Sequence, residues 1–374
     1  MAGIYIHIPF CRKACHYCNF HFSTSLNLKN DFLDALLKET QLQAPYLQNE
    51  SVNTIYFGGG TPSILPGDDL KAILEALQQY YSIDSDREVT LEANPDDITA
   101  EKLADWRQAG INRLSIGVQS FFDADLQWMN RAHTAQQAAG CIQLAQDTGF
   151  HNLTIDLIYG TPGLTDYNWH QNVASAIALQ VPHLSCYALT VEPGTALDTM
   201  IKKNKTPQVN TEDQARQFLL LMNWLQQAGY EHYEISNFAL PGKRSRHNSS
   251  YWQGKKYLGL GPSAHSFDGK SRQWNISNNA LYIQSIKNNT VPFEKEVLTE
   301  TQRLNEYIMT SLRTSEGVSI SYINQHFGMA AGNKVKAIAE KRIDSSRLIV
   351  KNDQLQLTKE GKLFADGIAA ELFA

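Results

Sequence analysis

The first two thirds of the chain alternate between short apolar runs and longer stretches in which apolar residues recur with helical spacing. Short runs bounded by turn residues are typical of buried strands, and the 3.6-residue period is typical of amphipathic helices. The pattern predicts strands at 4–8, 54–57, 88–93, 113–118, 153–158 and 184–189. It predicts helices at 31–46, 68–81, 100–109, 134–148, 167–179 and 212–228. Gly110, Gly149 and Gly229 follow three of these helices, where a left-handed C-cap is expected.

This alternation predicts a parallel sheet whose right-handed crossovers curl it toward a barrel. Six strand–helix units rather than eight predict an α/β fold of the open (β/α)6, or partial TIM-barrel, type. The site of such barrels lies at the C-terminal ends of the strands. Polar and glycine-rich segments follow the predicted strands at 11–18, 58–62, 92–95, 117–120, 156 with 159–163, and 187–192. We therefore expect an enzyme-like cavity at that end.

The alternation stops near Tyr230. Segments 231–238, 246–252 and 257–265 are predicted to be extended and to close over the barrel. After Pro292, predicted helices at 299–313, 320–327 and 331–341 precede a hairpin, 347–351 with 354–357, and a last helix at 360–373. This order indicates a winged-helix-like module. The sequence thus divides into a core barrel (1–230), a closing segment (231–292) and a C-terminal winged-helix-like domain (293–374).

Composition narrows the class of protein. The 374 residues are 43% hydrophobic, enough for a large core domain with an appendage. A net charge of −5 and the lack of a basic cluster in the C-terminal module argue against nucleic-acid binding. No apolar run approaches the length of a membrane span, and the first strand leaves no room for a signal peptide. We expect a cytoplasmic protein, with a homodimer among the oligomeric states left open.

Three of the five cysteines, Cys11, Cys15 and Cys18, lie within eight residues directly after the first strand. Thiolates this close indicate a loop around one metal centre, because cysteine sulfur holds iron–sulfur clusters. Structural zinc normally takes four ligands, and no second ligand pair follows. An odd triad also argues against a disulfide framework. A four-iron cluster held by three cysteines leaves one iron open to an external ligand. Cys141 and Cys186 are expected to pack in the core.

The spacing Cys-x3-Cys-x2-Cys after an apolar strand, followed by Gly58-Gly-Gly-Thr-Pro62, resembles the radical S-adenosylmethionine (SAM) superfamily. The resemblance implies that the amino and carboxylate groups of SAM chelate the open iron of a [4Fe–4S] cluster. It also implies that an electron from the cluster cleaves SAM to a 5′-deoxyadenosyl radical, and it implies the same open barrel. The glycine run lets the backbone approach a ligand closely. By resemblance it contacts the aminoacyl group of SAM.

A further set of residues resembles the coproporphyrinogen-oxidase-like branch of this superfamily, in which Tyr, Gly-Gly-Thr, Glu, Gln, Arg and Asp contact SAM in this order. The resemblance implies SAM contacts, to one or two SAM molecules, for Tyr5, Gly59, Gly60, Thr61, Glu92, Gln119, Arg131 and Asp156. Tyr17, between two of the cysteines, and Ala188 and His265 are further candidates. Taken singly, the polar members are more often surface or structural residues. Their placement on successive barrel units makes them a set.

One motif distinguishes branches of the family: His247-Asn248-Ser-Ser-Tyr251-Trp252. It could be an aromatic cluster on the open side of the barrel in which His247 bonds to the backbone. The pattern, however, resembles that of the heme-chaperone branch. Imidazole suits iron as an axial ligand and aromatic side chains suit a porphyrin face. The resemblance implies that His247, Asn248, Tyr251 and Trp252 contact heme.

The sequence departs from true coproporphyrinogen oxidases at two points. Those enzymes carry a further cysteine two residues after the third, where this chain has Phe20. Their N-terminal extension around the substrate is nearly missing here. We therefore expect a radical SAM protein that binds heme and delivers it to acceptor proteins. The alternatives are an oxygen-independent coproporphyrinogen III oxidase, another radical SAM reaction on a small molecule, and, more weakly, a metal-dependent regulator.

Overall fold

The computed structural model describes residues 1–48, 50–343 and 346–373. Its centre is a run of six parallel strands that pair in chain order. They are β1 (Ala2–Ile8), β2 (Val52–Gly59), β3 (Ile83–Ala93), β4 (Arg113–Gln119), β5 (Leu153–Tyr159) and β6 (His183–Ala188). All six predicted strands are confirmed. The sheet curves, and its first and last strands do not pair with each other in the described part of the chain.

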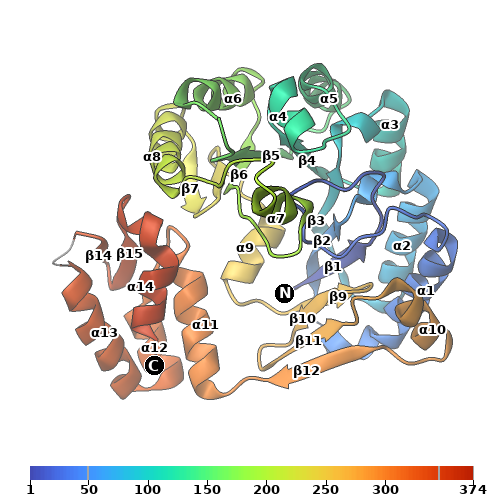
Figure 1. The fold of residues 1–374 in the computed structure, drawn as a ribbon. Coiled ribbons are helices and arrows are strands. Elements are labelled where there is room, and N and C mark those ends of the chain that lie inside the picture. Colours follow the sequence, from blue (N-terminus) through green and yellow to red (C-terminus); the bar gives the residue numbers. More distant parts are fainter. Residues whose placement is uncertain (49, 344–345, 374) are drawn as a thin grey trace.

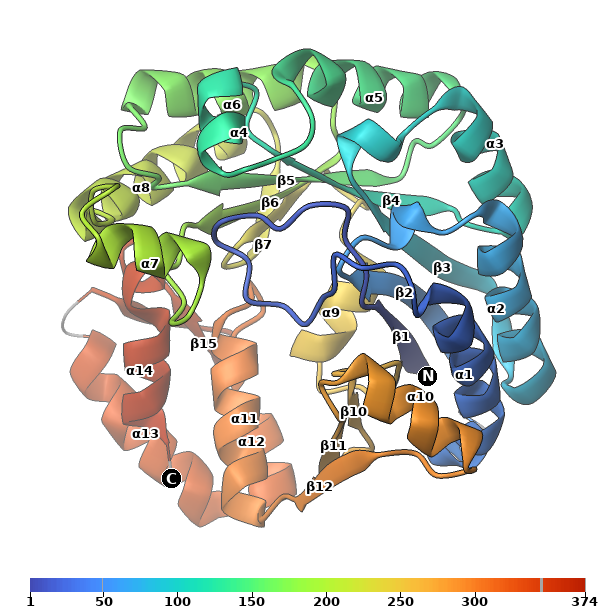
Figure 2. The same cartoon turned by 45° about the vertical axis from the view of Figure 1, so that its right-hand side comes forward.

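Helices cover the outer face of this curved sheet (Figures 1 and 2). The six predicted helices are confirmed as α1 (Lys29–Leu42), α2 (Gly67–Tyr80), α3 (Ala100–Ala109), α5 (Ala135–Asp147), α6 (Asp166–Ala178) and α8 (Thr211–Gln227). Gly110, Gly149 and Gly229 have φ values of +104°, +88° and +84°, as the C-cap prediction requires. Two short helices were not predicted, α4 (Asp123–Trp128) after β4 and α7 (Ala196–Lys202) after β6.

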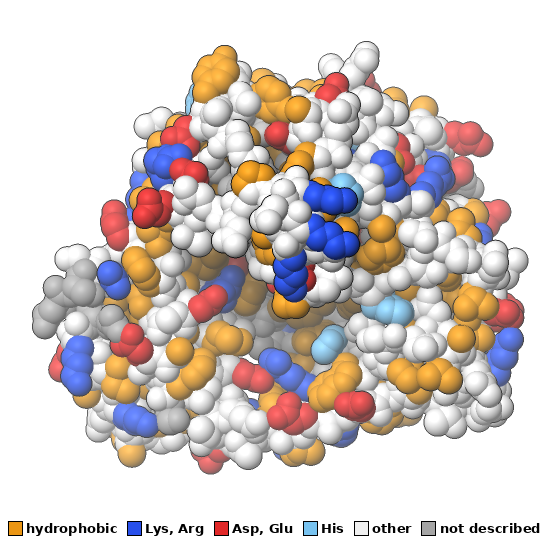
Figure 3. Space-filling view, in the orientation of Figure 1, with side chains coloured by type: hydrophobic (Ala, Val, Ile, Leu, Met, Phe, Trp, Pro, Cys, Tyr) orange, Lys and Arg blue, Asp and Glu red, His pale blue; other side chains and the backbone are white. Residues whose placement is uncertain are grey.

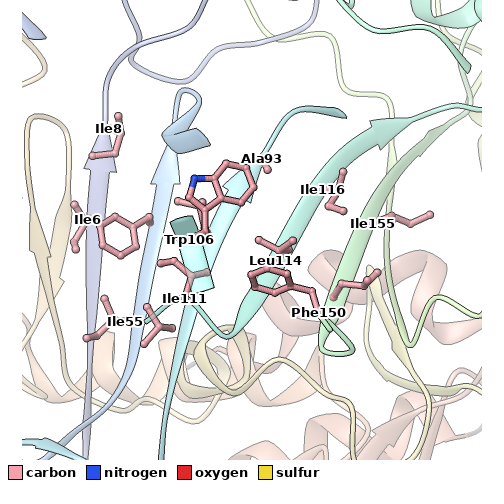
Figure 4. Packing of buried hydrophobic residues seen from close by; sticks show 14 of the residues in the cluster. Ile6, Ile8, Ile55, Ala93, Trp106, Ile111, Leu114, Ile116, Phe150 and Ile155 are labelled. Carbon is pink, nitrogen blue, oxygen red and sulfur yellow. The ribbon is translucent and has the colours of Figure 1, made fainter. Parts of the chain in front are cut away.

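The two faces of the strands differ in chemistry because side chains alternate along a strand. One face meets the helices: Figure 4 shows Ile6, Ile55, Leu114 and Ile155 of neighbouring strands in one cluster with Trp106 of α3, and all five are buried. This outer core fixes the curvature of the sheet.

The inner face is polar toward the start of the strands. Arg113 donates a hydrogen bond to Thr154, whose hydroxyl lies 2.9 Å from Nδ1 of His183. Nε2 of His183 lies 2.7 Å from the hydroxyl of Tyr233, and the guanidinium of Arg113 lies 3.9 Å from the carboxylate of Glu88. Nε of Arg113 has no hydrogen-bond partner among the described residues, but the other groups of this set contact one another, so polar side chains occupy the lower half of the barrel.

Residues 231–292 were expected to close over the barrel as extended structure, which is confirmed for the strands within 231–238 and 257–265 and is wrong for residues 246–252. The segment lengthens the sheet at both ends: β8 (Asn237–Ala239) and β7 (Glu231–Glu234) follow β6, whereas β9 (Tyr257–Leu260), β10 (His265–Phe267) and β11 (Ser271–Asn275) extend it beyond β1. The result, with β12 (Phe293–Val297), is a twelve-stranded sheet. Helix α10 (Asn279–Lys287) lies against α1.

Residues 246–252 form a helix, α9 (Arg246–Trp252), rather than an extended segment. Its N-cap Ser245 accepts a hydrogen bond from the backbone N–H of Asn248. The carboxylate of Glu88 on β3 accepts hydrogen bonds from the backbone N–H groups of Arg246 and His247. A carboxylate at a helix N-terminus satisfies N–H groups that have no partner within the helix. The barrel interior therefore stabilises this helix.

The C-terminal module has its own hydrophobic cluster, including Leu304, Ile323, Leu355 and Ile368. It contains α11 (Glu300–Leu312), α12 (Ile320–Phe327), α13 (Met329–Ile343), the hairpin β14 (Leu348–Lys351) with β15 (Gln354–Leu357), and α14 (Ala365–Leu372). The short strand β13 (Val318–Ser319) pairs with β15. The helices and the hairpin are confirmed, in the order typical of a winged-helix-like module. In the described residues, no helix has the length and apolar character needed to cross a membrane.

Candidate functional site

The cysteine loop begins directly after β1 and is closed at its base by backbone hydrogen bonds. The N–H of Cys11 donates to the carbonyl of Ser23 over 3.0 Å, and the N–H of Ser23 donates to the carbonyl of Pro9 over 2.9 Å. The loop is held further along by Leu197 of α7, whose N–H donates to the carbonyl of His16 over 2.8 Å. Cys11, Cys15 and Cys18 are free thiols and all three line one cavity.

This cavity, about 440 Å³, lies at the C-terminal ends of the parallel strands, where the barrel pattern predicted it. Nine of the eleven predicted SAM contacts line it: Tyr17, Gly59, Gly60, Thr61, Glu92, Gln119, Arg131, Asp156 and Ala188. The two that do not are Tyr5 and His265. Tyr5 points into the barrel, with its hydroxyl 3.3 Å from Nδ1 of His7, and His265 is exposed on β10.

The glycine segment brings its backbone against the cysteine loop. Gly59 has a φ of +106°, which disfavours any other residue. A Cβ at Gly60 would lie 2.7 Å from the carbonyl oxygen of Phe10. The N–H of Thr61 donates to that same carbonyl over 2.8 Å, and its hydroxyl donates to Sγ of Cys11 over 3.4 Å. The segment thus positions one of the sulfurs as well as one wall of the cavity.

Arg131 follows α4 and reaches across to the cysteine loop. Its Nη1 donates to Sγ of Cys15 over 3.3 Å, and its Nη2 donates to Oδ1 of Asn94 and to the carbonyl of Gly117, each over 2.7 Å. The guanidinium thus donates hydrogen bonds both to a sulfur of the cysteine loop and to the wall of the cavity. Burial raises the pKa of Cys11 to about 11, so binding a metal centre there must release a proton.

Two half-buried carboxyl groups, Glu92 on β3 and Asp156 on β5, line the cavity. Burial, with a smaller contribution from Asp156, raises the pKa of Glu92 to about 8, although hydrogen bonds from Tyr56 and Gly59 lower it. Burial likewise raises the pKa of Asp156 to about 6. The hydroxyl of Tyr56 donates to Oε1 of Glu92 over 2.8 Å. The cavity thus contains carboxyl groups and the guanidinium of Arg131, which together can meet the groups of a zwitterionic ligand with an added positive charge.

The donor set fits an iron–sulfur cluster: three thiols, converging from one loop on the rim of a cavity that also contains hydrogen-bond donors to sulfur. In residues 1–48, 50–343 and 346–373, no three side chains of Cys, His, Asp or Glu are arranged to hold a single metal ion.

The four predicted heme contacts do not line this cavity. His247 is 1% exposed, and both of its ring nitrogens are engaged: Nδ1 lies 2.9 Å from the hydroxyl of Thr54, and Nε2 lies 2.9 Å from the hydroxyl of Tyr251. Its ring stacks on Tyr56, with centroids 5.0 Å apart and 24° between the planes. Burial lowers the pKa of His247 to about 3, so the ring is neutral. Asn248, Tyr251 and Trp252 share α9 with it.

Sequence reasoning missed several residues that line the cavity, among them Asn94, Asp96, Phe22 and Tyr187. Asn94 and Tyr187 lie in strand-end segments that we expected to carry function, so position along the barrel could have identified them. Asp96 and Phe22 carry no such signal, because each lies in a loop whose path depends on the folded structure.

Comparisons with known proteins agree with this geometry. The model of the radical SAM superfamily matches residues 5–173, and that of the HemN C-terminal domain matches residues 298–364. The heme chaperone HemW of Bacillus subtilis is 32% identical over 98% of both chains, and that of Escherichia coli is 31% identical over 99% of this chain and 97% of its own. The HemW of Mycobacterium tuberculosis H37Rv is 34% identical over 99% of this chain and 94% of its own.

Among solved structures, coproporphyrinogen III oxidase (HemN) from Escherichia coli superposes with a TM-score of 0.86. The match covers 100% of this chain and 90% of the oxidase, at 24% sequence identity. At that identity the likeness shows a common fold.

Proposed function

The chain belongs to the heme chaperone HemW family of the radical SAM superfamily, and from this premise we propose that it binds heme and transfers it to acceptor proteins. One observation carries the proposal: the chain has a cavity of the radical SAM type, and its sequence is similar to those of heme chaperones over nearly its full length. The alternation of apolar strands and the cysteine triad would fit any radical SAM protein. The fold does not separate the chaperones from the oxidase HemN, which superposes over 100% of this chain at 24% identity, whereas identities of 31% to 34% over nearly the whole chain favour the chaperone family.

In this proposal Cys11, Cys15 and Cys18 hold a [4Fe–4S] cluster whose fourth ligand is SAM. When bound and reduced, such a cluster can supply an electron to SAM. The backbone of Gly59 and Gly60 would hold the aminoacyl end of SAM, because only glycine allows so close an approach. Arg131 would donate a hydrogen bond to the sulfur of Cys15.

The remaining cavity residues would orient SAM. Glu92, once ionised, can accept hydrogen bonds from the ammonium or ribose groups, and the hydroxyl of Tyr56 keeps one of its oxygens fixed. Gln119 on β4, Asp156 on β5 and Thr61 in the segment after β2 add polar contacts. Tyr17 and Ala188 form the walls next to the cysteine loop and β6. Tyr5 acts through Tyr56, on which its ring stacks at 6.1 Å.

Heme contact by the α9 motif is the part of the proposal that requires a structural change. His247 must leave Thr54 and Tyr251 to reach an iron atom, at a cost of about 1 kcal/mol per hydrogen bond. Trp252 lies under the guanidinium of Arg313, 5.5 Å away, so movement of α9 would also involve the C-terminal module. We propose that heme binding couples these two parts of the chain.

One observation bears on the rival activity, an oxygen-independent coproporphyrinogen III oxidase. Phe20 occupies the position of the fourth cysteine and lies at the rim of the cavity with 67% of its surface exposed. A phenyl ring cannot supply a thiolate. We therefore propose that this chain does not carry out the decarboxylation. The free thiols, with no disulfide in the described part of the chain, fit the reducing cytoplasm as the place of action.

The test is anaerobic incubation of cluster-reconstituted protein with hemin, and separately with SAM and coproporphyrinogen III. We expect a Soret band that passes to apo-myoglobin, used as a generic acceptor, and no decarboxylated porphyrin by mass spectrometry. Decarboxylated product with 5′-deoxyadenosine, lost in Cys15→Ala, would instead establish the oxidase. Absence of both results would leave a radical SAM protein with a different substrate.

A further inference from the structure

A hollow lies beside the cysteine loop, on the face of the molecule that carries α7 and the strand β10 (Figure 3). Figure 3 shows this hollow near the centre of the face, with two histidine side chains at its edge over the region of β9 and β10. The histidines of the neighbouring elements are His21, at the end of the cysteine loop, and His265, the first residue of β10. The rings of His21 and His7 lie 6.0 Å apart. Burial lowers the pKa of His7 to about 4, the hydrogen bond to the carbonyl of His21 opposes this, and the nearby imidazoles of His21 and His265 add smaller lowering contributions. The two imidazoles therefore border one region.

Only a few histidines are free to bind a ligand. Three have no hydrogen bond to either ring nitrogen from the described residues: His151, His170 and His265. His151 lies in the loop before β5, and His170 packs edge-on against Trp224 on the outer helices. His265 alone lies on the inner extension of the sheet.

The environment of His265 suits a planar, anionic ligand that contains a metal. Its ring is exposed and stacks on Trp274 of β11, with centroids 6.1 Å apart and 29° between the planes. Partial burial and the positive charge of Arg272 lower the pKa of His265, so the ring is neutral and a lone pair is available at pH 7. A neutral imidazole next to an indole offers an axial ligand and a stacking surface together.

The opposite edge of the hollow is basic. Figure 3 shows Lys and Arg side chains gathered over α7 and the adjoining part of the cysteine loop. Lys203, directly after α7, and Lys13, in the cysteine loop, are exposed, and neither forms an ion pair with a described residue. Carboxylates such as the propionates of a porphyrin would find cations there.

We propose that His265 is an axial iron ligand of a metalloporphyrin that enters this hollow, with Trp274 beside the ring and the basic edge facing the propionates. The inference rests on the proposed function, because it presupposes that the chain binds heme. It moves His265 from the SAM contacts to the heme site. It also explains how heme can bind before α9 moves, because the imidazole of His265 is accessible whereas that of His247 is enclosed.

The test is a spectroscopic titration of cluster-reconstituted full-length protein with hemin. His265→Ala should weaken hemin affinity at least tenfold and shift the Soret maximum, and added free imidazole should restore the wild-type spectrum by occupying the emptied position. His151→Ala, which removes another unengaged and exposed imidazole, serves as the matched control and should titrate like the wild type. Cluster content and far-ultraviolet circular dichroism would establish that each variant is folded.

Two results would overturn the assignment while leaving the proposed function standing. One is a His265→Ala protein with unchanged affinity and spectrum; the other is a Soret band that is lost only in His247→Ala. A wild-type protein that binds no hemin would remove the proposed function itself, and this site with it. The two failures are therefore distinguishable.

Discussion

Glu39 provides a sharp test of the physical reading of this fold, because its carboxylate is completely buried. It lies on α1 with 0% of its surface exposed and accepts three hydrogen bonds, from the N–H of Gly261 over 2.7 Å, Nδ2 of Asn275 over 2.7 Å and the hydroxyl of Tyr282 over 2.6 Å. None of these partners is a cation. Hydrogen bonds of this kind only partly replace the hydration of a charge.

The magnitude follows from the pKa. Burial raises the pKa of Glu39 from 4.5 to about 7, although its hydrogen bonds oppose the change. Between pH 4.5 and 7 the folded protein therefore holds a proton that the unfolded chain has lost. The corresponding stability is fully present below pH 4.5 and is lost as the pH rises through 7. A shift from 4.5 to about 7 corresponds to about 3 kcal/mol.

Glu39→Gln removes the titration and retains groups that can bond to Asn275 and Tyr282. We expect the difference in free energy of unfolding between wild type and variant to change by about 3 kcal/mol from pH 5 to pH 8, in favour of the variant at pH 8. Urea unfolding followed by circular dichroism measures it. Glu75→Gln, at an exposed position on α2, is the matched control. Parallel pH profiles for wild type and Glu39→Gln would refute the reasoning.

Three further predictions concern the cavity. Arg131→Ala should release iron to a chelator faster than the wild type, because hydrogen bonds to a charged sulfur and to Asn94 worth about 3 kcal/mol in total are lost. The affinity for SAM, measured by calorimetry, should fall about tenfold per pH unit below 8, because Glu92 must ionise to bind a cation. The Glu92→Gln variant should bind SAM weakly at every pH. Gly60→Ala should prevent cluster incorporation, because the added Cβ has no room next to the cysteine loop. Gly140→Ala on α5 is the control: its added Cβ would meet no neighbouring atom within 4 Å outside its own helix, so the change should stabilise the protein by about 1 kcal/mol.

Each of these predictions has an outcome that contradicts it. Equal rates of iron release in Arg131→Ala would mean that the guanidinium does not stabilise the sulfur. A pH-independent SAM affinity would show that Glu92 does not meet the positive charge of the ligand. Full cluster content in Gly60→Ala would mean that the glycine segment can move away from the cysteine loop.

The parallel core was predictable because its pattern is local. Each strand is a run of apolar residues, and in each helix the apolar residues recur with helical spacing. Residues close together in the sequence are therefore enough to predict these elements. Helix α9 was not predictable in this way. Its N-terminal N–H groups bond to Glu88, which lies 158 and 159 residues earlier in the chain. A polar heptapeptide becomes helical there through a partner that no local window contains.

The same difference between local and long-range contacts explains which site residues could be predicted from the sequence. Residues at the ends of β2, β3, β4 and β5 were predicted to share a cavity, and they do, because parallel strands end at one edge of the sheet. Tyr5 does not line the cavity because it lies in the middle of β1, opposite Tyr56, with its side chain pointing into the barrel. His265 does not line it either, because β10 belongs to an antiparallel extension that the strand–helix alternation does not reveal.

The pairing of β1 on both sides also determines when the protein can be completed during synthesis. Tyr5 lies between Tyr56 on β2 and Gly259 on β9, so β1 gains its second neighbour only about 250 residues after β1 itself has left the ribosome. At about 5–20 residues per second, this edge stays open for roughly 10 to 50 s. An unpaired, apolar strand edge is prone to pair with other chains. The cysteine loop continues directly from this strand. The strand that supports the cluster is therefore fully paired only after about two thirds of the chain has been synthesised, so metal loading becomes a late step in biogenesis.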